Sequence, residues 1–251
     1  MYLGLDLGTS GVKALLIDGA QKIVGAANGA LDVSRPHPGW SEQDPADWIR
    51  ATEEAVGALK HTHPRELAAV RGIGLSGQMH GATLLDAADA VLRPCILWND
   101  TRSFAEAAAL DGDPRFRALT GNIVFPGFTA PKLAWVKAHE PATFARVAKV
   151  LLPKDFLRLW LTGEHISEMS DSAGTSWLDV GRRAWSPELL AATDLGVEHM
   201  PSLVEGTEPA GTLRAELAAR WGIVGPVTVA GGAGDNAASA CGMGTVAEGR
   251  A

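Results

Sequence analysis

The stretch that most constrains the fold of this chain lies at its N-terminus, where residues 3–17 read LGLDLGTSGVKALLI. Leu3, Leu5 and Leu7 alternate with small or acidic residues, and a second patterned stretch, residues 12–17, follows the sequence Gly-Thr-Ser-Gly. Alternation with a period of two, interrupted by a short glycine-containing turn, predicts a β-hairpin.

The turn of this predicted hairpin, Gly8-Thr9-Ser10-Gly11, is suited to binding an anion. Small side chains leave its backbone N–H groups accessible, and such groups form concave anion sites. Asp6 precedes the turn on the first strand. A phosphate with a divalent cation fits this combination, but an ordinary glycine hairpin with a solvated Asp6 explains the hairpin equally well.

The composition is that of a globular protein, with 46% hydrophobic and 20% charged residues among 251. A net charge of −7 and the lack of Lys/Arg runs argue against nucleic-acid binding, and no apolar stretch has membrane-spanning length. The N-terminus enters a strand directly, so we expect an unprocessed, cytoplasmic chain. Cys95 and Cys241 lack metal-site spacing and are expected to be buried apolar residues.

Strands and helices are expected to alternate, which predicts an α/β architecture. The expected strands beyond the hairpin are residues 23–27, 31–33, 70–75, 83–86, 96–98, 150–153 and 227–230. The expected helices are residues 45–60, 103–110, 130–138, 154–161, 189–193, 213–221 and 236–242. Asp44 is expected to cap the first helix, with Pro45 as its first residue, and small residues are expected to pack the last helix closely.

A glycine-rich motif, GIGLSG at residues 72–77, follows the pattern of a dinucleotide-binding turn. Such a site requires a helix to begin within the motif. Gln78-Met79-His80-Gly81 follows instead, and Gly81 disfavours a helix there. We therefore disfavour a dinucleotide site, and the chain has no GxxxxGK[ST] phosphate loop.

A second glycine-flanked acid, Asp235, lies where the strand at 227–230 leads through glycines into a helix. Helix N-terminal amides tend to keep such a carboxylate ionised, which makes it available as a proton acceptor or cation ligand. An isolated aspartate there is more often only a helix cap. Because Asp6 and Asp235 both follow apolar strands, where open α/β sheets bind ligands, the pair favours a functional site.

Polar side chains between these acids are suited to a polyhydroxy ligand. Gln78 and His80 offer amide and imidazole groups, and Trp98-Asn99-Asp100 offers an aromatic surface, an amide and a carboxylate. A structural histidine and a core tryptophan are the alternatives for His80 and Trp98. The neighbouring glycines support a site carried by loops.

Taken together, these segments resemble the FGGY carbohydrate kinase family of the actin-like ATPase superfamily. GLDLGTSGVKALLID is similar to the first phosphate motif of that superfamily. The further motifs are, in order, SRPHPGWSEQDPADW, SGQMHGATLLD, ILWNDTR, PGFTAPKLAWV, LLPKDFLRLWLTGE, SDSAGTSWLDV and AGGAGDNAASACGMG. The resemblance covers essentially the whole chain and implies a ribonuclease H-like α/β domain, with a mixed sheet flanked by helices.

The resemblance implies phosphoryl transfer from ATP, with Mg²⁺, to the C5 hydroxyl of D-xylulose. Asp235 would accept the hydroxyl proton, and Asp6 would position Mg²⁺ directly or through water. Residues implied near the γ-phosphate are Gly8, Thr9, Ser10, Gly11 and Lys13. Residues implied near the sugar are Gln78, Met79, His80, Trp98, Asn99, Asp100 and Asn236. Met79-His80 is similar to the element of the D-xylulose-specific members, whereas glycerol kinases have an Arg-Glu pair there.

The resemblance also implies that residues 1–251 are the N-terminal sugar-binding and catalytic-base domain, with the C-terminal ATP-binding domain absent from this chain. We therefore expect the isolated chain to lack turnover. The glycine run before Asp235 is one residue longer than the expected pattern. Two roles are open for Lys154-Asp155. The pair supports the site residues without contacting the substrate or, as we favour, it is the solvated start of a helix.

Three alternatives remain at this point. They are a kinase for another ketose or polyol, a non-catalytic sugar-binding module, and a nucleotide-dependent scaffold like actin. The scaffold is disfavoured because such proteins lack the Gln78-Met79-His80 and Trp98-Asn99-Asp100 elements. We expect no nucleic-acid or membrane partner, and a homodimer is compatible with the sequence.

Overall fold

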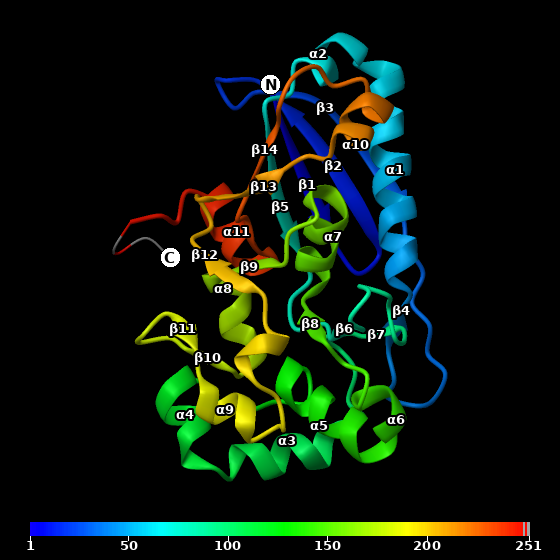
Figure 1. The fold of residues 1–251 in the computed structure, drawn as a ribbon. Helices are drawn as coiled ribbons and strands as arrows, with labels where there is room; N and C mark the ends of the chain where they lie inside the picture. Colours follow the sequence, from blue (N-terminus) through cyan, green and yellow to red (C-terminus); the bar gives the residue numbers. More distant parts are fainter. Residues whose placement is uncertain (248, 250–251) are drawn as a thin grey trace.

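The N-terminal hairpin forms as predicted and begins a mixed sheet (Figure 1). The computed structural model describes residues 1–247 and 249. In the hairpin, β1 (Tyr2–Leu7) pairs antiparallel with β2 (Gly11–Ile17), and β2 pairs antiparallel with β3 (Ile23–Ala30). The Gly8 amide donates to the Gly11 carbonyl at 3.0 Å and closes the turn.

The other half of the sheet is built around β5 (Gly72–Gly77), which runs parallel to β1. On its other side β5 pairs in parallel with β14 (Thr228–Ala230) and, further along, with β15 (Ala233–Gly234). The edge strand β13 (Pro209–Thr212) is antiparallel to β14. β1, β5 and β15 therefore end at the same edge of the sheet.

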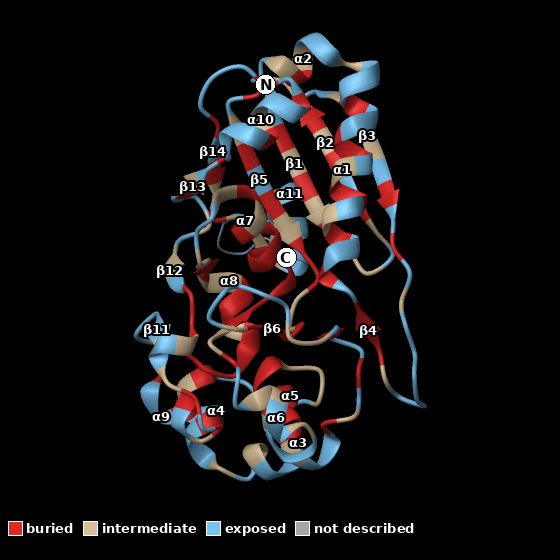
Figure 2. Ribbon diagram, turned by 45° about the vertical axis from the view of Figure 1, so that its right-hand side comes forward, coloured by how far each residue is buried: buried red, intermediate tan, exposed pale blue. Residues whose placement is uncertain are grey.

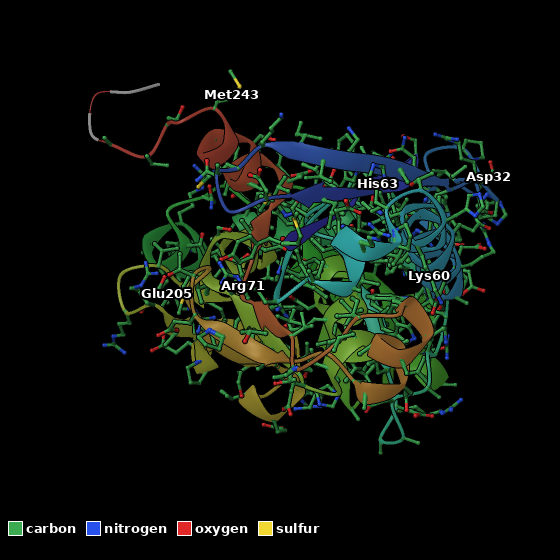
Figure 3. All side chains as sticks on the ribbon, turned by 90° about the horizontal axis from the view of Figure 1, so that it is seen from above. Asp32, Lys60, His63, Arg71, Glu205 and Met243 are labelled. Carbon is green, nitrogen blue, oxygen red and sulfur yellow. The ribbon has the colours of Figure 1, made fainter. Side chains whose placement is uncertain are left out.

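One face of the sheet is covered by three helices, α1 (Pro45–Thr62), α7 (Pro153–Thr162) and α10 (Ala215–Trp221). Apolar side chains that alternate along β1 and β2 are buried against them in one hydrophobic cluster. As predicted, Asp44 caps α1, accepting from the Ala46 amide at 2.9 Å. Lys60, labelled in Figure 3, lies near the end of α1. Its amine donates to the Arg220 carbonyl of α10 at 2.6 Å.

A second hydrophobic cluster lies in the lower part of the molecule in Figure 1, among short helices. Its main helices are α3 (Phe104–Asp111), α4 (Pro114–Thr120), α5 (Thr129–His139) and α9 (Pro187–Ala191). Their inner faces are buried and their outer faces exposed (Figure 2). Strands β6 (Thr83–Leu85), β7 (Cys95–Ile96) and β8 (Lys149–Leu151) connect this cluster to the sheet.

The remaining elements are short. They are β4 (Glu42–Gln43), α2 (Pro64–Ala68), α6 (Pro141–Phe144), β9 (Ile166–Glu168), α8 (Met169–Ser172), η1 (Ala173–Thr175), β10 (Leu178–Asp179), β11 (Ala184–Trp185), η2 (Val197–His199), β12 (Ser202–Val204) and α11 (Asp235–Gly242). Within the described residues, no helix combines the length and apolar character needed to cross a membrane.

Most predicted elements are present with shifted ends, and the sheet flanked by helices confirms the predicted α/β class. Residues 72–77 lie entirely within β5, so no helix begins at this glycine motif. The strand expected at 31–33 is wrong, because β3 ends at Ala30 and extended loop follows.

Three expectations about burial are wrong. Cys95 is buried, but Cys241 is exposed, because α11 lies on the surface and contributes no buried residue. For the same reason the small residues of α11 are not closely packed. Lys154 and Asp155 are buried rather than solvated, because the start of α7 packs into the interior.

Replacing Gly29 by alanine is expected to lower the free energy of unfolding. A Cβ at this position in β3 would lie 2.1 Å from the Ala51 carbonyl oxygen of α1, so the helix would have to move off the sheet. Such overpacking costs about 1–3 kcal/mol, which urea unfolding measures. Gly74→Ala is the control, because a Cβ there meets no atom within 4 Å. Equal losses for the two variants would contradict this packing.

Candidate functional site

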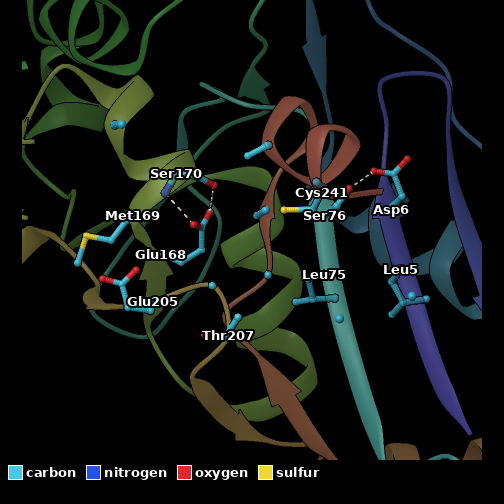
Figure 4. A pocket seen from close by; sticks show the side chains of 18 of the residues that line it. Leu5, Asp6, Leu75, Ser76, Glu168, Met169, Ser170, Glu205, Thr207 and Cys241 are labelled. Carbon is cyan, nitrogen blue, oxygen red and sulfur yellow. Dashed lines mark hydrogen bonds between the residues drawn. The ribbon is translucent and has the colours of Figure 1, made fainter. Parts of the chain in front are cut away.

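Asp6 lies near the end of β1, on the sheet face opposite α1. Its carboxylate accepts a hydrogen bond from the Ser76 hydroxyl of the neighbouring strand β5 (Figure 4). Lys13 stands directly opposite Asp6 across the hairpin, so the two opposite charges share one face. All three side chains line an open groove.

The groove has a volume of about 980 Å³ and extends from the sheet to β9, α8 and α11. Asp6 and Ser76 form one side, and Glu168 and Ser170 form the opposite side (Figure 4). Cys241 of α11 lies over the groove between them. Most of the remaining lining is apolar, so charged groups are concentrated at the two sides of the groove.

Asp235 is the first residue of α11 and follows β15 directly. Its Oδ1 accepts from the Asn236 amide at 2.8 Å. Partial loss of hydration raises the pKa of its carboxyl, and the negative charge of Asp6 raises it further. A carboxylate with a raised pKa accepts a proton more readily than one of ordinary pKa.

His80 is held in one orientation and one protonation state. Its φ of +67° is rare for a residue with a Cβ, its ring lies 4.7 Å from that of Phe128, and its Nδ1 lies 2.8 Å from the Gly174 carbonyl oxygen. Burial, and next the charge of Lys132, lower the pKa of His80 to about 4. The ring is therefore neutral, with hydrogen on Nδ1, and Nε2 accepts hydrogen bonds.

The backbone of His80 is fixed by two residues of α5 that the sequence analysis missed. Its carbonyl accepts from the Thr129 hydroxyl at 3.1 Å and from the Lys132 amine at 2.8 Å. Lys132 also donates to the Gly127 carbonyl, and burial lowers the pKa of this lysine to about 7. A lysine at a helical core position is the one sequence feature that pointed to such a role.

Gln78 connects the predicted phosphate turn with the predicted sugar loop. Its Oε1 accepts from the Thr9 hydroxyl at 3.0 Å, and its Nε2 donates to Gln43 Oε1 at 2.9 Å. Gln43 in turn donates to the Thr9 carbonyl at 2.7 Å. Gln78 is buried with both ends of its amide engaged, so it holds the loop in place rather than facing a ligand. Gln43 carried no periodic pattern and was not predicted.

The Trp98-Asn99-Asp100 segment divides into exposed and buried parts. Trp98 is half exposed and donates from Nε1 to the Thr9 hydroxyl at 3.0 Å, and Asn99 is exposed. Asp100 is buried, and its oxygens accept from Arg102 and from the Ser41 amide. The carboxylate of Asp100 is therefore occupied within the protein, which argues against direct contact with a sugar.

Met79 brings the predicted sugar loop against the segment that leads to Asp235. A Cβ on Gly234 would lie 2.9 Å from Met79 Cγ, and a Cβ on Gly174 would lie 3.3 Å from Met79 Cε. The predicted sugar residues Met79 and His80 are thus next to the segment that carries Asp235. Asn236, which follows Asp235, is exposed, and its Oδ1 accepts from the Ala237 amide.

The predicted phosphate turn is accessible to solvent, but some of its hydrogen-bonding groups already have partners within the protein. Ser10 and Lys13 are exposed, whereas the Gly8 amide and the Thr9 hydroxyl already make hydrogen bonds within the protein. Among the described residues, no group of three or more His, Cys, Asp or Glu side chains forms a ready metal cage. The single carboxylate of Asp6 beside the turn fits Mg²⁺, because proteins commonly hold this ion through one or two carboxylates together with substrate phosphates and water.

Comparison with known proteins gives one consistent result. Residues 1–242 match the N-terminal domain of the FGGY family of carbohydrate kinases. The chain is 55% identical to xylulose kinase from Escherichia coli strain K12 over 247 residues, which covers 98% of this chain and 50% of that protein. It is likewise 55% identical to xylulose kinase from Klebsiella pneumoniae, covering 100% of this chain and 52% of that protein.

Solved structures agree with the sequence relatives. A xyloylose kinase from Brucella ovis is 75% identical and superposes with a TM-score of 0.98, covering 99% of this chain and 51% of that one. A xylulose kinase from Rhodospirillum rubrum is 32% identical with a TM-score of 0.94, covering 98% and 51%. The chain spans about half the length of the relatives it matches.

The His80→Gln substitution is expected to weaken the loss of stability in acid. The pKa of His80 is about 4 in the folded chain against an ordinary 6.5, so the unfolded chain binds the proton first as the pH falls. Titration of His80 therefore removes up to about 3 kcal/mol of stability as the pH falls from its ordinary pKa to its folded one.

Urea unfolding at neutral pH and near the folded pKa of His80 measures this difference. The variant should lose less stability than the wild type between the two conditions. Parallel losses in both proteins would contradict a partly buried, neutral His80.

Proposed function

The chain belongs to the FGGY family of carbohydrate kinases, and from this premise we propose that residues 1–251 form the sugar-binding, catalytic-base domain of a D-xylulose kinase. The observation that carries the proposal is the common edge of the sheet. There, Asp6, the Gly8–Gly11 turn and Asp235 lie beside the loop of Met79 and His80. The similarity to proteins named xylulose kinase supports D-xylulose as the acceptor.

Asp235 acts as the general base in the proposed reaction. Its carboxylate takes the proton of the C5 hydroxyl as that oxygen attacks the γ-phosphorus of ATP, and the bond to the bridging oxygen breaks to release ADP. A positioned base of this kind contributes about 10²–10⁴-fold to the rate. Its partly dehydrated position and the nearby negative charge of Asp6 favour proton uptake.

The hairpin turn and Asp6 serve the transferred phosphate. The turn from Gly8 to Gly11 receives the γ-phosphate, with the exposed Ser10 as its most accessible side chain and the exposed Lys13 nearby on β2. Asp6 would hold Mg²⁺, directly or through water. When bound, Mg²⁺ neutralises charge on the phosphate oxygens. Thr9 keeps the turn in shape through its bonds to Gln78 and Trp98.

The sugar is recognised beside the Asp235 segment. His80 Nε2 accepts a hydrogen bond from a sugar hydroxyl, because Nδ1 is directed to the Gly174 carbonyl. Met79 packs against the carbon skeleton, and the exposed Trp98, Asn99 and Asn236 contribute further contacts. Gln78 and Asp100 act indirectly, since their polar atoms are engaged within the protein.

A kinase for another ketose or polyol is the nearest alternative. A phosphorylation panel of D-xylulose, D-ribulose and glycerol, run with a C-terminal kinase domain supplied, distinguishes these substrates, and a preference for D-ribulose or glycerol would overturn the assignment. A non-catalytic sugar-binding module is the other alternative, and it would bind sugar without phosphorylating it even when the nucleotide contacts are supplied.

We expect residues 1–251 alone to lack kinase turnover. The family match is to the N-terminal domain of these kinases, and we propose that a further domain supplies the contacts to adenine. ADP release with D-xylulose and Mg-ATP measures this. A rate within tenfold of ordinary kinases, about 1–100 s⁻¹, would contradict the proposal that a further domain is needed for nucleotide binding.

Asp235→Asn is expected to abolish phosphoryl transfer and to leave D-xylulose binding largely intact. Asparagine keeps the size of the side chain but cannot accept the proton, so the rate should fall by about 10²-fold or more. Calorimetry on residues 1–251 measures binding. Turnover is measured in a two-domain version, in which the second half of the Escherichia coli xylulose kinase follows residue 242. Loss of sugar binding would instead assign Asp235 to ligand recognition.

A further inference from the structure

A cluster of five buried charged side chains lies beneath the segment that leads to Asp235. Lys154 Nζ lies 2.7 Å from Asp155 Oδ1, 3.5 Å from Asp171 Oδ2 and 3.6 Å from Glu168 Oε1. Arg158, one turn further along α7, completes the cluster. No side chain of this cluster is more than 2% exposed. Burying so many charges is costly, so the cluster calls for an explanation beyond stability.

Arg158 directs its donors at backbone rather than mainly at the acids. Its Nη1 donates to the Ala230 carbonyl at 2.6 Å, its Nη2 donates to the Gly231 carbonyl, and its Nε donates to the Ile166 carbonyl at 3.2 Å. A guanidinium presents these donors in one rigid plane, which lysine cannot do. Arg158 therefore fixes two consecutive peptide groups where β14 ends.

The other end of the same segment is tied to the same cluster. The Gly234 amide donates to the Ser170 hydroxyl at 3.1 Å, and that hydroxyl donates to Glu168 Oε1 at 3.1 Å. Glu168 also caps α8, accepting from the Ser170 amide at 2.7 Å. Residues 230–234 are thus held at both ends from one buried group of charges.

The segment between these ties is rich in glycine. Its Gly231 amide donates to the Glu208 carbonyl at 2.8 Å and its Gly232 amide donates to the Gly206 carbonyl at 2.9 Å. Gly232 has a φ of +75°, and a Cβ there would lie 2.1 Å from the Leu75 carbonyl oxygen, so the position requires glycine. Glycines lose the most conformational freedom on ordering. Beyond the segment, α11 contributes no buried residue. The position of Asp235 therefore depends on what holds the chain before it.

We propose that Arg158 is a positioning residue for Asp235, acting with Ser170 as a clamp on residues 230–234. The clamp fixes the direction in which the chain enters α11 and so places the carboxylate beside the Met79-His80 loop. This inference rests on the proposed function only in calling Asp235 the base. The clamp itself is a property of residues 1–251 and can be tested without turnover.

Arg158→Lys in residues 1–251 is the first test, because it keeps the charge of the cluster and loses the planar set of donors. We expect the Gly231, Gly232 and Gly234 amides to exchange hydrogen about tenfold faster or more. We also expect the ¹³C carboxyl resonance of Asp235, assigned through Asp235→Asn, to shift. Arg93→Lys is the matched control, at a largely buried arginine that pairs with Glu42 and Glu140. It should lower stability and leave these signals unchanged.

Ser170→Ala is the second test and loosens the segment from its other end. If Arg158→Lys does not fold, Ser170→Ala decides, and the same changes in exchange and in the Asp235 resonance support the clamp. Variants that fold, lose stability and leave both signals unchanged would overturn it, because a merely structural arginine predicts that outcome.

In the two-domain version, Arg158→Lys should lower kcat and leave KM for D-xylulose within about twofold, because a misplaced base weakens the transition state more than the ground state. A rise in KM alone would count against a positioning role. If the wild-type two-domain protein shows no turnover, the proposed function fails, and the exchange measurements still decide the clamp.

Discussion

The structure of the site depends on the pairing of three parallel strands. In register, Asp6 of β1 lies beside Ser76 of β5, and Gly77 of β5 lies between Leu7 of β1 and Gly234 of β15. Each strand ends at this level, so the turn that starts at Gly8, the loop that starts at Gln78 and the helix that starts at Asp235 all begin one residue further on. A slip of one residue in any pair would turn the side chains of that strand to the opposite face of the sheet, and the site residues would no longer lie together.

A chain of hydrogen bonds then links the parts that the strands bring together. A closed ring of hydrogen bonds joins Thr9 in the turn, Gln78 at the start of the loop after β5 and Gln43 before α1. Each amide in this ring uses its oxygen as acceptor and its nitrogen as donor, so each has one orientation. The Gly8–Gly11 turn and the loop that starts at Gln78 are therefore held in a fixed relation.

Sequence could predict what local pattern determines. The hairpin, the cap at Asp44 and the strand expected at 70–75, which lies at Gly72–Gly77 in the structure, follow from alternation and from residue preferences within a few positions. What sequence missed is set by distant contacts. β15 is two residues long and exists only through pairing with β5. Nothing local distinguishes Lys154-Asp155 from a solvated helix start, because their burial is decided by the acids of β9 and α8.

Lys132 has a consequence for the working range of the protein. A buried amine whose pKa is about 7 changes charge near neutral pH, which in many proteins makes a switch. Here the amine serves two carbonyl acceptors, those of His80 and Gly127. A neutral amine still carries two N–H bonds and a protonated one carries three. Both hydrogen bonds therefore persist in either state, and the backbone conformation of His80 is indifferent to the titration occurring beside it.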